Sequence, residues 1–148
     1  MTTLQQHSLE ATIQHMYRLM GQYIPDVQNL GWNSVAEVFN GVKDLPYRPD
    51  DTAPECLGAG ECVKRPGLTL VLGGDCDDKV VLAGAALLWL GYPVRIVTAS
   101  YNADGQMQHT YLELYANGRW YPFDATYAGN VPFYEAPYTA KQVWLRMQ

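Results

Sequence analysis

Hydrophobic positions in the first quarter of the chain follow a helical period. Apolar side chains recur three or four residues apart between Ser8, a suitable N-cap, and Pro25, a suitable stop, which predicts an amphipathic helix facing a core. A second, short helix is predicted from Ser34-Val35-Ala36-Glu37, which has the spacing of a capping box, to Gly41. The apolar positions of the first helix are Leu9, Ile13, Met16, Tyr17, Met20 and Ile24.

A third helix is predicted where the pattern loses its polar face. The run Lys79–Leu90 is apolar on every side, and Gly91-Tyr92-Pro93 supplies a left-handed cap and a stop. Cys76 therefore lies at the N-terminus of a buried central helix. The helix dipole and the free backbone N–H groups favour a thiolate there, whereas the aspartates at positions 75, 77 and 78 oppose it.

A strand period replaces the helical one further along the chain. Met107–Tyr115 alternates in hydrophobicity, Asn117-Gly118 is a strong type I′ turn signal, and Arg119–Asp124 returns as the partner strand. With a two-residue turn, Asp124 lies opposite Tyr111.

This register gives His109 a partner. Because side chains alternate along a strand, His109 shares the face of Tyr111 and is therefore a diagonal neighbour of Asp124. The Asp124 carboxylate can then accept a ring N–H of His109 and leave the other nitrogen for the Cys76 sulfur. A lone cysteine in a helix is more often an inert core residue, but the conjunction of these three residues favours a nucleophilic site.

Four segments resemble the core of the transglutaminase-like superfamily. They are Gly74–Asp78, the end of the apolar helix with Gly91–Arg95, His109–Leu114 and Gly118–Thr126, and they contain Cys, His and Asp in the family's order. The resemblance implies a papain-related α+β fold, with N-terminal helices and a central Cys-bearing helix packed on an antiparallel sheet. It also implies Cys76 as nucleophile, His109 as general base and acid, and Asp124 as orienting carboxylate. Tyr111 stands where the family commonly has a tryptophan.

A weaker resemblance extends upstream. Leu45–Asp50 and Pro66–Leu70 are similar to segments of small stand-alone members of this superfamily from phages and prophages. In such a site the backbone N–H of Cys76 is one expected oxyanion donor. The second is normally a side chain from the upstream loop, for which the sequence leaves Thr69, Arg65 and Trp32 as candidates.

The organisation predicted is one domain over residues 1–148. A helical part (1–45) is followed by a long loop (46–67), a catalytic core (68–127) and a C-terminal extension (128–148). The loop is rich in Pro, Gly and Asp, and loops of this length are uncommon unless functional. It is either one wall of a substrate cleft or a solvated connector.

Composition and charge argue against several classes of function. The chain of 148 residues carries a net charge of −5 and no basic cluster, which argues against nucleic-acid binding. It has no apolar stretch that spans a bilayer and no signal-peptide pattern, so we expect a soluble cytoplasmic or virion-associated protein without a membrane partner. Cys56 and Cys62 are spaced too widely for a zinc knuckle, and no metal or other cofactor is expected.

These observations favour a cysteine-dependent peptidase or amidase. Its substrate would be a peptide or protein amide, and the intermediate would be an acyl-thioester on Cys76 resolved by water. Two alternatives remain: a protein-glutamine acyltransferase that crosslinks, and a non-catalytic binding or assembly module, for example of a phage virion, that retains the three residues as structural fill.

Overall fold

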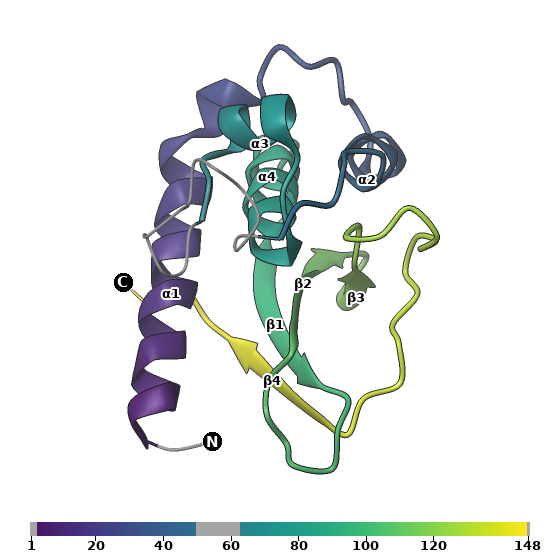
Figure 1. Ribbon diagram of the computed structural model, residues 1–148. Coiled ribbons are helices and arrows are strands. Elements are labelled where there is room, and N and C mark those ends of the chain that lie inside the picture. The colour runs from purple at the N-terminus through teal and green to yellow at the C-terminus, as the bar shows by residue number, and fades with distance from the viewer. Residues whose placement is uncertain (1–2, 50–62, 148) are drawn as a thin grey trace.

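An antiparallel sheet and the helices packed on it form the core of the protein. The computed structural model describes residues 3–49 and 63–147, with side chains from residue 9 onward. The elements are α1 (Thr3–Gln22), the 3-10 helix η1 (Ile24–Asp26), α2 (Val35–Lys43), α3 (Pro66–Leu72), α4 (Cys76–Trp89), β1 (Val94–Ser100), β2 (His109–Ala116), β3 (Arg119–Phe123) and β4 (Ala140–Trp144). The sheet order is β3-β2-β1-β4, and α4 lies between α1 and α2 in Figure 1. The predicted α+β architecture is confirmed.

Helix α4 is central, as its sequence predicts. Its residues from Asp78 to Leu87 are all buried, and it packs against α1, α2, α3 and β2. The close approach of α1 depends on Gly84, because a Cβ there would lie 2.4 Å from the Met20 sulfur. At the C-terminal end Gly91 has φ +95°, and the amide of Tyr92 donates to the Leu87 carbonyl at 2.9 Å. The predicted glycine cap is therefore confirmed.

The bounds of the first two helices differ from the prediction. Helix α1 begins at Thr3, so Ser8 lies within it and is not the N-cap. Ser34 caps α2 as predicted, since its Oγ accepts from the Glu37 amide at 3.2 Å, but α2 continues past Gly41. Gly41 serves packing instead: a Cβ there would lie 2.2 Å from the Trp32 ring.

The long loop is shorter than predicted. Pro66 and Gly67 belong to α3, because proline suits the first position of a helix and the Asp26 carboxylate accepts from the Gly67 amide at 2.8 Å. Cys56, Cys62 and the middle of the loop lie outside the described residues. The structure therefore does not test whether the loop is a wall of a substrate cleft or a solvated connector.

The hairpin register is confirmed. Ala116 pairs with Arg119 and Leu112 with Phe123, while Asn117 and Gly118 have φ +52° and +81°, as a type I′ turn requires. Strand β1 pairs antiparallel with β2 on its other side, placing Ala99 opposite His109.

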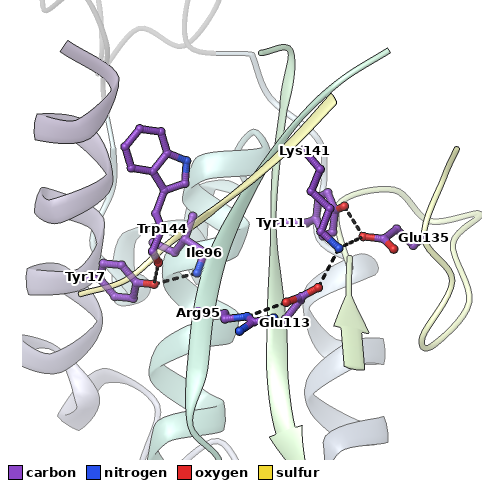
Figure 2. Close-up of polar contacts among 8 residues, drawn as sticks. All are labelled: Tyr17, Arg95, Ile96, Tyr111, Glu113, Glu135, Lys141 and Trp144. Carbon is purple, nitrogen blue, oxygen red and sulfur yellow. Dashed lines mark hydrogen bonds and ion pairs between the residues drawn. The ribbon is translucent and has the colours of Figure 1, made fainter. Parts of the chain in front are cut away.

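The C-terminal part completes the sheet with a strand that the hydrophobic pattern did not predict. Strand β4 pairs with β1, and the Tyr17 hydroxyl ties α1 to both strands (Figure 2). It donates to the Trp144 carbonyl and accepts from the Ile96 amide at 2.8 Å.

Within the described residues no helix is long and apolar enough to cross a membrane.

Candidate functional site

Cys76 is the first residue of α4, held there by two reciprocal hydrogen bonds. The Asp75 carboxylate accepts from the Asp78 amide at 3.2 Å, and the Asp78 carboxylate accepts from the Asp75 amide at 3.1 Å. The turn before it requires Gly73, which has φ +76° and whose Cβ would lie 2.3 Å from the Pro46 carbonyl. Cys76 remains partly exposed.

His109 and Asp124 form a buried pair, as the hairpin register predicts. His109 Nε2 lies 2.7 Å from Asp124 Oδ2, and both side chains are at least nine-tenths buried. The other carboxylate oxygen accepts from the Thr126 amide at 3.2 Å. With Nε2 taken by the carboxylate, Nδ1 is the ring nitrogen left to exchange a proton with a thiol.

The structure places Cys76 and His109 on the wall of one cavity. The cavity has a volume of about 170 Å³ and receives residues from α1, α4, β1, β2 and the segment before β2. We call it the thiol cavity; its lining is Leu9, Thr12, Ile13, Cys76, Asp77, Thr98, Met107, Gln108, His109 and Thr110. The contribution of α1 was not predicted, because those residues read as core positions of an amphipathic helix.

The electrostatics of the thiol oppose the expectation of a helix-stabilised thiolate. Burial raises the pKa of Cys76, the charges of Asp77 and Asp75 raise it further, and a hydrogen bond from the Thr110 amide only partly offsets them. The Cys76 thiol donates to Asp77 Oδ1 at 3.7 Å. The helix N-terminus does not dominate here, because desolvation and two adjacent carboxylates act against it.

This raised pKa predicts a slow, pH-dependent thiol. At neutral pH the thiolate fraction of Cys76 should fall below that of a free cysteine with pKa about 8.5, so alkylation should keep accelerating beyond about pH 9. Asp77→Asn should speed alkylation at neutral pH, since it removes one of the charges that raise the pKa. The measurement needs a Cys56→Ser/Cys62→Ser background. A rate plateau near pH 6 would instead show a thiolate–imidazolium pair.

Two of the three candidates for a second oxyanion donor, Thr69 and Arg65, are hydrogen-bonded elsewhere. Thr69 is fully buried and its hydroxyl donates to the Arg65 carbonyl within α3 at 3.5 Å. The Arg65 guanidinium binds both carboxylate oxygens of Asp26, at 3.0 and 2.7 Å. The Trp32 ring packs on Gly41.

Two tyrosines that the sequence motifs did not predict as site residues lie close to the start of α4, where Cys76 is. Tyr47 forms an isolated parallel bridge with Gly74, two residues before Cys76, and its ring centroid lies 5.5 Å from that of Tyr127. Burial raises the pKa of Tyr47 to about 12, so its hydroxyl stays protonated. Tyr127 also lies over His109, with ring centroids 5.8 Å apart.

A buried lysine holds these two tyrosines in place. Lys79 lies one turn after Cys76, and its ammonium donates to the Leu45 carbonyl at 2.8 Å and the Thr126 carbonyl at 2.7 Å. Burial lowers its pKa. Because the two carbonyls precede Tyr47 and Tyr127, Lys79 brings both segments to the start of α4. A lysine at the start of an otherwise apolar run was the sequence signal for this role.

Asp78 has a second role besides capping. Its carboxylate accepts from the Lys64 amide at 2.8 Å and pairs with the Lys64 ammonium at 3.1 Å, with both side chains fully buried. The ion pair fixes the segment leading into α3 against the first turn of α4.

In the part of the chain that the structure describes, no three His, Cys, Asp or Glu side chains converge as metal ligands do.

Comparisons with known proteins bear on this arrangement. A sequence model of the transglutaminase-like superfamily matches residues 28–125. No curated protein matches the chain. Among solved structures, the chain is similar to an arylamine N-acetyltransferase of Nocardia farcinica, with 19% identity, a TM-score of 0.49, and coverage of 73% of this chain and 43% of that one. It is also similar to a Cytophaga hutchinsonii protein assigned provisionally as a cysteine protease, with 17% identity, a TM-score of 0.49, and coverage of 89% and 47%. The chain spans less than half the length of each.

Proposed function

Because the chain belongs to the transglutaminase-like superfamily, we propose that it is a cysteine-dependent amide hydrolase in which Cys76, His109 and Asp124 carry the chemistry. The observation that supports this most directly is the buried contact of 2.7 Å between His109 Nε2 and Asp124 Oδ2, on a histidine that shares a cavity with Cys76. The carboxylate fixes the ring so that Nδ1 serves as the base.

The raised pKa of Cys76 shapes the first step. The thiol of Cys76 is protonated in the resting protein, so His109 must take its proton as the sulfur attacks the amide carbonyl. The new bond joins Sγ to the carbonyl carbon. Collapse of the tetrahedral intermediate breaks the carbon–nitrogen bond, and His109 returns the proton to the leaving amine. Water, activated by the same nitrogen, then hydrolyses the thioester.

The developing oxyanion has two donors in this proposal. One is the backbone N–H of Cys76 at the start of α4, where the amide has no intrahelical partner. The other is the Tyr47 hydroxyl. Its support is the bridge between Tyr47 and Gly74, which brings the Tyr47 backbone to the segment just before Cys76. In the resting protein the Tyr47 hydroxyl hydrogen-bonds Tyr127.

A product analysis tests hydrolysis directly. Glutamine-containing peptides are incubated with the protein and a labelled primary amine, and cleavage, deamidation and label incorporation are measured by mass spectrometry. We expect cleavage or deamidation to exceed incorporation, because water at about 55 M resolves an acyl-enzyme unless an amine is specifically held. Cys76→Ala should abolish every product. Incorporation that depends on Cys76 and exceeds hydrolysis would instead identify a crosslinking acyltransferase.

One observation favours a second candidate. The thiol donates to Asp77, and burial disfavours its ionisation, as in a residue that packs rather than reacts. A binding module of a protein assembly, such as a virion, would have these properties. No product in the assay above, together with normal folding of Cys76→Ala, would support that candidate.

A further inference from the structure

His109 lines two cavities. One is the thiol cavity, whose lining includes Cys76. The other is a cavity of about 240 Å³, here called the tyrosine cavity, which shares Gln108 and His109 with the first. The lining of the tyrosine cavity is Tyr101, Gln108, His109, Asp124, Tyr127, Asn130, Tyr134 and Ala136.

Three tyrosines line the tyrosine cavity, and no lysine or arginine is among the described residues of its lining. The ring centroids of Tyr101 and Tyr127 lie 6.2 and 5.8 Å from that of His109, within the range of aromatic pairs. The Asp124 carboxylate that reaches the wall is already bound by His109 and by the Thr126 amide. A cavity of about 150 Å³ accepts benzene, so this one has room for a single aromatic side chain.

The outer wall is fixed by a network of charges (Figure 2). Glu135, between the lining residues Tyr134 and Ala136, accepts from the Tyr111 hydroxyl at 2.5 Å and from the Lys141 ammonium at 2.8 Å. Lys141 also binds Glu113 at 2.9 Å. The network ties the segment between β3 and β4 to strands β2 and β4, so the cavity is formed before a ligand enters, as ligand sites usually are.

The two cavities can hold the two parts of a substrate that lie on either side of the scissile bond. In the proposed reaction the acyl carbon bonds to Cys76 Sγ and therefore lies in the thiol cavity. The leaving amine takes its proton from His109 Nδ1, and because His109 and Gln108 line both cavities, the side chain that follows the scissile amide can extend past them into the tyrosine cavity. The geometry points to the tyrosine cavity as the subsite for an aromatic side chain on the residue that follows the scissile amide. This inference rests on the proposed function for its orientation.

Matched ligands test the subsite without chemistry. Phenylalaninamide and alaninamide carry the same charge and represent the leaving fragment, so their binding to the intact protein can be compared by NMR titration. We expect phenylalaninamide to bind at least about 10-fold more tightly, since burying an aromatic side chain contributes more than 1.4 kcal/mol. In peptides with a common acyl part, phenylalanine after the scissile bond should raise kcat/KM over alanine by a similar factor.

Tyr134→Ala should bring both ratios close to one. Tyr138→Ala is the matched control, because Tyr138 has nearly the same exposure, 46% against 49%, and lies outside the lining. Equal affinities for the two amides in the unmodified protein would overturn the subsite, even if peptides are hydrolysed. Selective binding of phenylalaninamide without any hydrolysis would retain the subsite and reject the hydrolase instead.

Discussion

Asp124→Asn is expected to lower kcat/KM on the order of 10⁴-fold without unfolding the protein. Asparagine can keep its carbonyl oxygen on the Thr126 amide, as Asp124 Oδ1 does at 3.2 Å. Its NH₂ group then faces His109 Nε2, which lies 2.7 Å from Oδ2 in the unmodified protein. Because an NH₂ group donates, Nε2 must accept and the ring proton moves to Nδ1. The nitrogen needed as a base is then blocked.

Two measurements separate this tautomer effect from a loss of charge. The ¹⁵N shifts of His109 should report an Nε2–H tautomer in the unmodified protein and an Nδ1–H tautomer in the variant, whether or not a substrate is known. Asp77→Asn is the matched control, since the carboxylate that it removes is hydrogen-bonded to the Cys76 thiol, whereas the carboxylate of Asp124 is hydrogen-bonded to the His109 ring. Comparable losses in both variants would mean that Asp124 acts only through its charge.

The second large effect concerns stability. Lys64→Met should lower the free energy of unfolding by about 3–5 kcal/mol, because it leaves the Asp78 carboxylate buried without its counterion. The matched control is Lys43→Met. The Lys43–Asp44 pair has nearly the same length, 3.2 against 3.1 Å, but the Asp44 side chain is 67% exposed while both partners of the Lys64–Asp78 pair are fully buried. Its loss should cost about 0–1 kcal/mol.

Urea unfolding of both variants measures this difference. If Lys64→Met is too unstable to purify, the double variant Lys64→Met/Asp78→Asn keeps the test available, since it also removes the uncompensated charge. It should be less destabilised than the sum of the two single changes. Equal losses in Lys64→Met and Lys43→Met would mean that water reaches the buried pair.

Local patterns determined most of the fold around the site. The apolar run after Lys79 specified α4, and Asn117-Gly118 specified a register that brings His109 and Asp124 together. These features follow from short-range rules of periodicity and turn geometry, which need no knowledge of the rest of the chain. The bounds of α1 and α2 were less predictable, because Ser8 and Gly41 have residue types that suit helix ends but occupy interior positions.

By itself, the sequence therefore determined the three candidate catalytic residues, the helix and hairpin that carry them, and the α+β class. Tertiary structure decided the surroundings: the ion pair of Lys64 with Asp78, the Lys79 ammonium that joins the segments of Tyr47 and Tyr127, and the pKa of the thiol. The physical reason is the distance along the chain over which each property is determined. Secondary structure and register depend on neighbouring residues, whereas desolvation and buried charge pairing depend on groups that only the folded chain brings into contact.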